Sequence, residues 1–157
     1  MVSALAHVQD PTDGRERLRL WLRLLRLSRS VENEVRERFR AQFDTTLPRF
    51  DVMAALARRP EGMMMGELSR WLLVSNGNVT GIVDRLVADG MVARAAQEKD
   101  RRASIVRLTD RGRKTFEVMA TAHAGWIDEL LGGFTPSEAG ELAEVFAAQR
   151  EDGEERT

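Results

Sequence analysis

The stretch from Gly66 to Thr109 reads GELSRWLLVSNGNVTGIVDRLVADGMVARAAQEKDRRASIVRLT and contains several structural signals in a fixed order. A short helix is expected over 66–74, a polar break over 75–77 and a second helix over 77–88, which Asp89-Gly90 ends. Two strands, 91–94 and 104–108, then enclose a charged loop over 97–102. Helix, turn, helix and β-hairpin in this order predict a winged helix-turn-helix, a module that places its second helix in the major groove of DNA.

The apolar residues of these two helices recur at helical spacing, so each helix is expected to bury one face. In the first helix this face holds Leu68, Trp71 and Leu72, and in the second it holds Val79, Ile82, Val83 and Leu86. The polar residues of the second helix fall on the other side, which leaves Asn78, Thr80, Gly81, Asp84 and Arg85 facing outward.

Long amphipathic helices flank this module. One is expected over 15–43, with apolar marks from Leu18 to Phe43, and others follow Thr109-Asp110 and Thr135-Pro136. Met63-Met64-Met65 can add a strand to the hairpin, and packing is its expected role. The apolar stripe of the helix 15–43 is longer than a small winged-helix core can cover. This helix therefore requires a partner surface. The expected division is a loose N-terminus (1–14), dimerisation helices (15–44 and 110–150), a DNA-binding domain (45–109) and a charged tail (151–157).

Composition excludes several classes of site. The 157 residues include no cysteine and two histidines, so disulfides, thiol redox sensing and a cysteine- or histidine-built metal site are not expected. No signal peptide or membrane span is recognisable, and a cytoplasmic protein is the default. No metalloprotease, hydrolase or nucleotide-binding motif is present, so neither an enzyme nor a cofactor is expected.

The net charge of -1 conceals an uneven distribution. Residues 49–114 carry 13 Lys/Arg and 8 Asp/Glu, whereas residues 115–157 carry 2 and 10. A basic middle beside an acidic end fits a localised DNA-binding face, although a solvated surface with chance clustering gives the same counts.

The chain resembles MarR-type transcriptional regulators, the family named for multiple antibiotic resistance. The resemblance covers roughly residues 15–150 in layout, and its specific motifs lie within 47–112. These motifs are Leu47-Pro48-Arg49-Phe50-Asp51-Val52-Met53-Ala54-Ala55-Leu56, Gly66-Glu67-Leu68-Ser69, Asn78-Val79-Thr80-Gly81-Ile82-Val83-Asp84-Arg85-Leu86, Asp89-Gly90-Met91-Val92-Ala93-Arg94, Asp100-Arg101-Arg102-Ala103 and Val106-Arg107-Leu108-Thr109, with Gly112.

The resemblance implies a mainly α fold with a small β wing, in which N- and C-terminal helices form a homodimer. It also implies binding to a pseudo-palindromic operator, usually as a repressor that a small ligand releases. In the family this ligand is often an aromatic or phenolic acid, or a thioester of one.

Contacts to DNA are expected from the second helix of the pair. Asn78 and Thr80 are candidates for reading bases, because asparagine pairs with adenine and the threonine methyl contacts thymine. Ser75 and Asn76 have two open roles, helix capping with a phosphate contact or base reading. Arg85 can reach a phosphate or a base, or pair with Asp84 or Asp89. Arg70 is expected at a phosphate.

The wing supplies the second group of expected contacts. Arg102 matches the family arginine that enters the minor groove, where narrow A·T tracts concentrate negative potential. Asp100 resembles the family aspartate that holds a wing arginine and anchors the loop. Lys99 and Arg101 are expected at phosphates, although a charged loop of this kind is often only solvated.

An effector cleft is expected between the flanking helices and the winged helix. Its candidate lining residues are Trp21, Arg26, Phe50, Met53, His123 and Trp126. Each has a simpler role: Arg26 as a surface charge and the other five as core. The alternative reading is therefore a winged-helix module for DNA or protein contacts that has no small-molecule effector.

Overall fold

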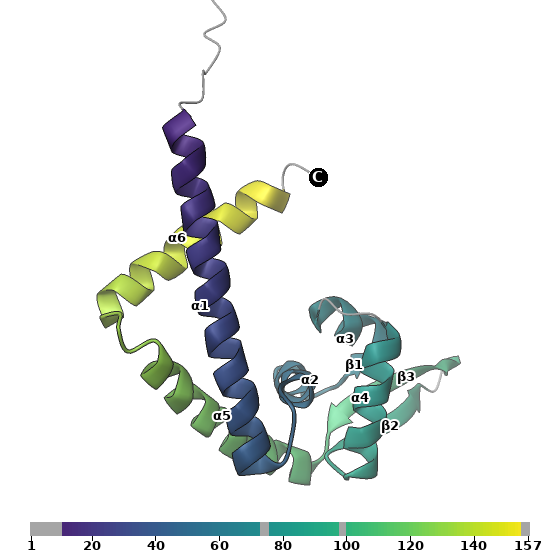
Figure 1. The fold of residues 1–157 in the computed structure, drawn as a ribbon. Helices are drawn as coiled ribbons and strands as arrows, with labels where there is room; N and C mark the ends of the chain where they lie inside the picture. The colour runs from purple at the N-terminus through teal and green to yellow at the C-terminus, as the bar shows by residue number, and fades with distance from the viewer. Residues whose placement is uncertain (1–10, 73–75, 98–99, 155–157) are drawn as a thin grey trace, which may run out of the picture.

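The computed structural model describes residues 11–72, 76–97 and 100–154. The fold is mainly helical with a small sheet, as the sequence predicts (Figure 1). Its elements are α1 (Pro11–Phe43), α2 (Leu47–Ala57), β1 (Met63–Met64), α3 (Met65–Leu72), α4 (Asn76–Ala88), β2 (Val92–Gln97), β3 (Asp100–Leu108), α5 (Asp110–Leu130) and α6 (Pro136–Glu154). The winged helix-turn-helix lies to one side of the C-terminal end of α1, α5 runs from it to the other side, and α6 crosses the N-terminal half of α1 in this view (Figure 1).

The junction between the hairpin and α5 is fixed by local hydrogen bonds. The Thr109 hydroxyl accepts a hydrogen bond from the backbone N–H of Gly112 at 3.0 Å and donates to the Gly90 carbonyl at 2.7 Å. Gly90 itself has a φ of +70°, the left-handed conformation that ends α4. A Cβ on Gly112 would lie 1.9 Å from the Met91 carbonyl oxygen, so glycine is required there.

The three strands form an antiparallel sheet in the order β1-β3-β2. Met63 pairs with Val106 and Met64 with Ile105, which confirms the extra strand expected from the methionines. The expected loop over 97–102 is wrong in extent, because Gln97 pairs with Asp100 and the backbone of Asp100–Arg102 belongs to β3. A strand pair is held by backbone hydrogen bonds, so charged residues can continue the hairpin.

The core of the winged helix lies among α2, α3, α4 and the sheet. Leu68, Val79 and Val83 are completely buried there. Trp71 is not in this core, contrary to the sequence-based expectation: it is 52% exposed, and the Arg58 guanidinium lies 5.7 Å from its ring centroid. The reason is helical geometry, since Leu68 and Ser69 occupy the buried arc of α3 and Trp71 falls outside it.

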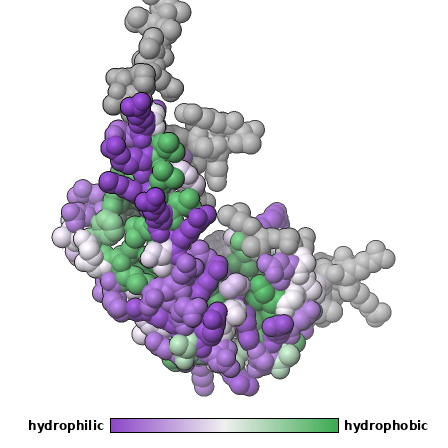
Figure 2. Space-filling view, viewed as in Figure 1, coloured by the Kyte–Doolittle hydropathy of each residue, from purple (hydrophilic) through white to green (hydrophobic). Residues whose placement is uncertain are grey.

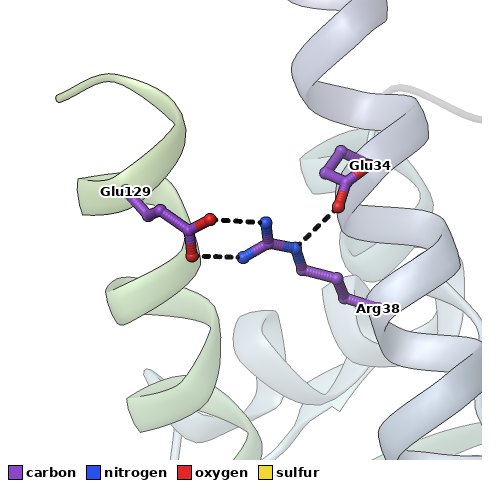
Figure 3. Close-up of polar contacts among 3 residues, drawn as sticks. All are labelled: Glu34, Arg38 and Glu129. Atoms are coloured by element: carbon purple, nitrogen blue, oxygen red, sulfur yellow. Dashed lines mark hydrogen bonds and ion pairs between the residues drawn. The ribbon is translucent and has the colours of Figure 1, made fainter. Parts of the chain in front are cut away.

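The C-terminal half of α1 is held against α5. Phe39 is completely buried, with Phe50 and Trp126 at ring-centroid distances of 4.7 and 5.0 Å. Beside this cluster, Arg38 donates two hydrogen bonds of 2.8 and 2.9 Å to Glu129 and a third of 2.9 Å to Glu34 (Figure 3). These bonds raise the pKa of Arg38 and lower that of Glu129, so both groups stay ionised.

Two properties of the described residues bear on function. No described helix combines the length and the apolar character that crossing a bilayer requires. Within the same residues, His, Asp and Glu side chains form no group of three that could hold a metal ion.

Candidate DNA-binding interface

The exposed face of α4 carries the polar side chains that the sequence assigns to it. Asn78, Thr80 and Arg85 are exposed, while Val79 and Val83 on the opposite side are completely buried. The periodicity of α4 is therefore confirmed: Asn78 and Arg85 share one side of the exposed arc, and Thr80 lies at its other edge. Arg70 is exposed on α3, where its Nε donates to the Gly66 carbonyl at 3.3 Å.

Two ion pairs fix α4 on its support. Arg94 on β2 contacts Asp84 at 2.7 Å, and Arg49 on α2 pairs with Asp89 just after α4. Both carboxylates that the sequence offered to Arg85 are thus engaged by other arginines, and Arg85 makes no ion pair within the described parts of the chain. Sequence reasoning missed the Arg49–Asp89 pair because 40 residues separate its members and neither position shows a local pattern.

A groove of about 500 Å³ runs between α4 and the corner where α1 meets α2. Arg40, Arg49 and Arg85 line it, together with Asn78 and Asp44. The three guanidinium groups come from α1, α2 and α4, and Arg40 and Arg49 are paired with Glu37 and Asp89. Arg85 is thus the guanidinium of this groove that is placed for a phosphate contact.

Part of the predicted interface lies outside the described residues. Ser75 and Lys99 are among the undescribed positions, so their expected roles stay predictions. The backbone of Asn76 begins α4, and that of Asp100, Arg101 and Arg102 begins β3, on the hairpin beside α4. The placement of the wing next to the helix is as expected, and the side-chain roles of these four residues stay predictions.

The expected effector residues divide into two groups. Phe50, His123 and Trp126 gather around Phe39, where partial burial lowers the pKa of His123. Phe50 and Trp126 are buried and pack as core, the simpler role considered for them. His123 is half-buried and also lines a cavity of about 410 Å³ between α1 and α5, so its expected role stays a prediction. Asp51, next to Phe50 in sequence, has its pKa raised by burial and by Glu32, with Arg36 opposing the shift.

Trp21 and Arg26 are not brought to that cluster, so the six predicted residues do not form one cleft within this chain. Both are exposed on the N-terminal half of α1. At 1.5 Å per residue, Trp21 lies roughly 27 Å along the helix axis from Phe39. Met53 lines a separate cavity between α2, α4 and α5.

Comparison with known proteins supplies the family. The model of the MarR family matches residues 43–103. A crystal structure of a MarR family transcriptional regulator from Silicibacter pomeroyi superposes with a TM-score of 0.73 at 36% identity, covering 94% of this chain and 100% of that one. The chain belongs to the MarR family.

Other MarR-related proteins add context. The chain is 39% identical over 93 residues to the transcriptional activatory protein BadR of Rhodopseudomonas palustris, covering 57% of this chain and 53% of BadR. It thus aligns with about half of the length of that protein. The fold is also that of a mutant MarR from E. coli complexed with operator DNA, with a TM-score of 0.74 at 24% identity over 85% of this chain and 94% of that one. These relatives and the fold indicate a transcriptional regulator rather than an enzyme.

Proposed function

We propose that this MarR-family regulator binds a pseudo-palindromic DNA operator as a homodimer and represses transcription until a small aromatic or phenolic acid, or its thioester, releases it. The observation that carries the DNA-binding part is the exposed side of α4, where Asn78, Thr80 and Arg85 lie outside the buried apolar stripe and the β2–β3 hairpin lies beside the helix. In a winged helix this face is the one presented to the major groove.

The homodimer is supported by apolar surface outside the winged helix. Leu20, Trp21 and Phe146 are 54%, 56% and 40% exposed, and Figure 2 shows apolar surface over α1 and near α6. A groove of about 500 Å³ between these helices has almost purely apolar walls, which include Leu24, Leu142 and Phe146. Exposed apolar surface of this kind is typical of a protein interface. A second copy would cover it and would hold two α4 helices at a spacing of about one turn of DNA.

Selection of binding sites from fragmented genomic DNA, followed by affinity measurement with and without aromatic acids, tests the whole proposal. Enrichment of inverted repeats, together with release of the protein from them by an acid, would support the proposed ligand-responsive regulator. Selective binding that no acid relieves would favour the alternative, a winged-helix module without an effector. BadR is named an activatory protein, so a transcription assay on the selected sites must show repression for that part of the proposal to hold.

Asn78→Ala is expected to reduce affinity for the selected operator by about 1–3 kcal/mol and to change affinity for random duplex little. The reason is that a base-reading amide contributes only where the matching base is present. Fluorescence anisotropy on both duplexes measures the two affinities. Equal losses on both would show that Asn78 positions the backbone and does not read sequence.

Arg102→Ala is expected to weaken binding to operator and random DNA alike and to lower the salt dependence by about one unit of slope. One cation fewer in the minor groove releases about one counterion fewer on binding. The measurement is affinity across a salt series. Arg59→Ala, which removes an exposed arginine from the turn after α2, is the matched control and should leave the slope intact. An unchanged slope in Arg102→Ala would contradict insertion of the wing.

A further inference from the structure

Two exposed glycines, Gly77 and Gly81, form a ridge along the middle of the outward side of α4. They are four residues apart, and a Cβ added to either would find open space. Asn78 and Arg85 lie on one flank of this glycine ridge, and Asp84, whose carboxylate contacts an arginine of β2 at 2.7 Å, lies on the other. The β2–β3 hairpin therefore stands on one flank of α4, and other elements border the opposite flank.

The flank away from the hairpin faces the corner between α1 and α2. The groove of about 500 Å³ described above separates the two, with Asn78, Gly81 and Arg85 on the α4 wall and Arg40 and Thr46 on the corner wall. Arg40 lies in the last turn of α1. Thr46 is the N-cap residue of α2, but its side chain makes no capping hydrogen bond. Polar donor groups from α1, α4 and the start of α2 thus line one groove.

The dimensions of DNA indicate what occupies this groove. An α-helix with its side chains is about 10–12 Å across, and the major groove of B-DNA is about 12 Å wide. When the glycine ridge enters the major groove, the two sugar-phosphate backbones that border the major groove run along the two flanks of α4. One backbone therefore passes the hairpin, and the other passes the α1–α2 corner.

The α1–α2 corner holds Arg40 at a defined place. The Asp44 N–H donates to the Arg40 carbonyl at 3.2 Å, and Asp44 has a φ of +48°, the left-handed conformation that ends many helices. The Thr45 N–H donates to the Phe39 carbonyl at 3.4 Å. Arg40 pairs with Glu37 at 3.3 Å, and the two side chains are 71% and 65% exposed. An ion pair as exposed as this one is weak, so a phosphate can replace Glu37 as the acceptor.

We propose that the α1–α2 corner is a second DNA-binding surface, which holds a phosphate of the backbone that passes α4 on the side away from the hairpin. Arg40 and Arg85 supply the positive charge, and the Thr46 hydroxyl donates a hydrogen bond. Asp44 lines the same groove, and its carboxylate repels the phosphate and limits the affinity. This inference rests on the proposed DNA-binding function and adds a contact from α1, a helix otherwise assigned to dimerisation.

Fluorescence anisotropy across a salt series, with the full-length chain, tests the contribution of Arg40. Arg40→Gln should weaken binding to the selected operator and to random duplex alike, about 10-fold, and should lower the salt slope by about one unit. Arg40→Lys keeps the charge and should keep the slope. Arg59→Gln is the matched control, because Arg59 is also exposed and paired with a nearby glutamate but follows the other end of α2. It should bind like the wild type.

Asp44→Asn tests the opposing charge in the same groove. Removing a carboxylate that faces a phosphate should strengthen binding to both DNAs about 3-fold. Asparagine adopts the left-handed conformation as readily as aspartate, so this variant keeps the corner intact. Unchanged or weaker binding in Asp44→Asn would show that no phosphate lies at this corner.

Operator duplexes that each carry one uncharged methylphosphonate locate the contact. At one position beside the half-site, the replacement should weaken wild-type binding about 10-fold and should not weaken Arg40→Gln further, because the lost charge and the lost guanidinium belong to one contact. Additive losses at every position overturn the direct contact. A loss in Arg40→Gln that is confined to the operator overturns the assignment to a phosphate, since phosphates are present in both duplexes.

The outcomes separate the corner from the proposed function. Weakened operator binding in Asn78→Ala, with wild-type affinity and slope in Arg40→Gln, overturns the corner and leaves DNA binding by α4 in place. Failure of the wild type to bind any duplex overturns both. The corner is supported when Arg40→Gln loses affinity and slope on both DNAs, Arg40→Lys restores the slope and one methylphosphonate position accounts for the loss.

Discussion

Replacing both Leu142 and Phe146 with glutamine is expected to yield a 17.7 kDa monomer and to weaken operator binding about 100- to 10,000-fold. The two side chains lie on α6 in the apolar groove beside α1, where they are 38% and 40% exposed. In the proposed dimer a second copy covers them, so the amides would be buried without partners. The loss in affinity is large because a monomer engages one half-site, whereas a dimer engages two with a high effective concentration for the second.

Light scattering with size-exclusion chromatography gives the mass, and anisotropy on the selected operator gives the affinity. Glutamine adds no charge, so general repulsion from DNA does not enter the comparison. Met64→Gln is the control, because Met64 is 42% exposed on β1, outside the groove. A double variant that stays dimeric and binds like the wild type would show that this groove is not the dimer interface.

Phe39→Ala should lower the free energy of unfolding by about 3–5 kcal/mol, a large share of the stability of a domain of this size. Phe39 is completely buried, and four aromatic residues surround it: Phe43, Phe50, His123 and Trp126. The substitution leaves a cavity where α1, α2 and α5 meet. Because α1 and α5 belong to the proposed dimerisation region and α2 to the winged helix, this cavity would loosen the link between the two.

Urea denaturation followed by circular dichroism measures the change, at one protomer concentration since dimerisation would add to the apparent stability. Met64→Ala removes an exposed side chain and should change the free energy of unfolding by about 0.5 kcal/mol or less. A loss of less than about 1 kcal/mol in Phe39→Ala would mean that the aromatic cluster does not hold these helices together.

The candidate DNA-binding face was largely predictable, because it depends on local patterns. The helical spacing of the apolar residues in α4 predicted that Val79 and Val83 are buried, and it therefore predicted that Asn78 and Arg85 are exposed. The effector residues were not predictable in the same way. Spacing along a helix predicts which residues share a face. It does not predict at which point along a helix of 33 residues another helix packs against that face. Trp21 and Phe39 share the stripe of α1, yet only Phe39 reaches the core.

The sequence by itself determined the helices, the caps at Thr109 and Gly90, the added strand at Met63 and the basic middle of the chain. These features arise from hydrophobic periodicity and from backbone preferences that act over a few residues. Only the tertiary structure decided that Arg49 meets Asp89, that Arg38 meets Glu129 and that Arg111 approaches Gly90. Such contacts join residues far apart in the chain, and they form only where the packing of whole helices brings two side chains together.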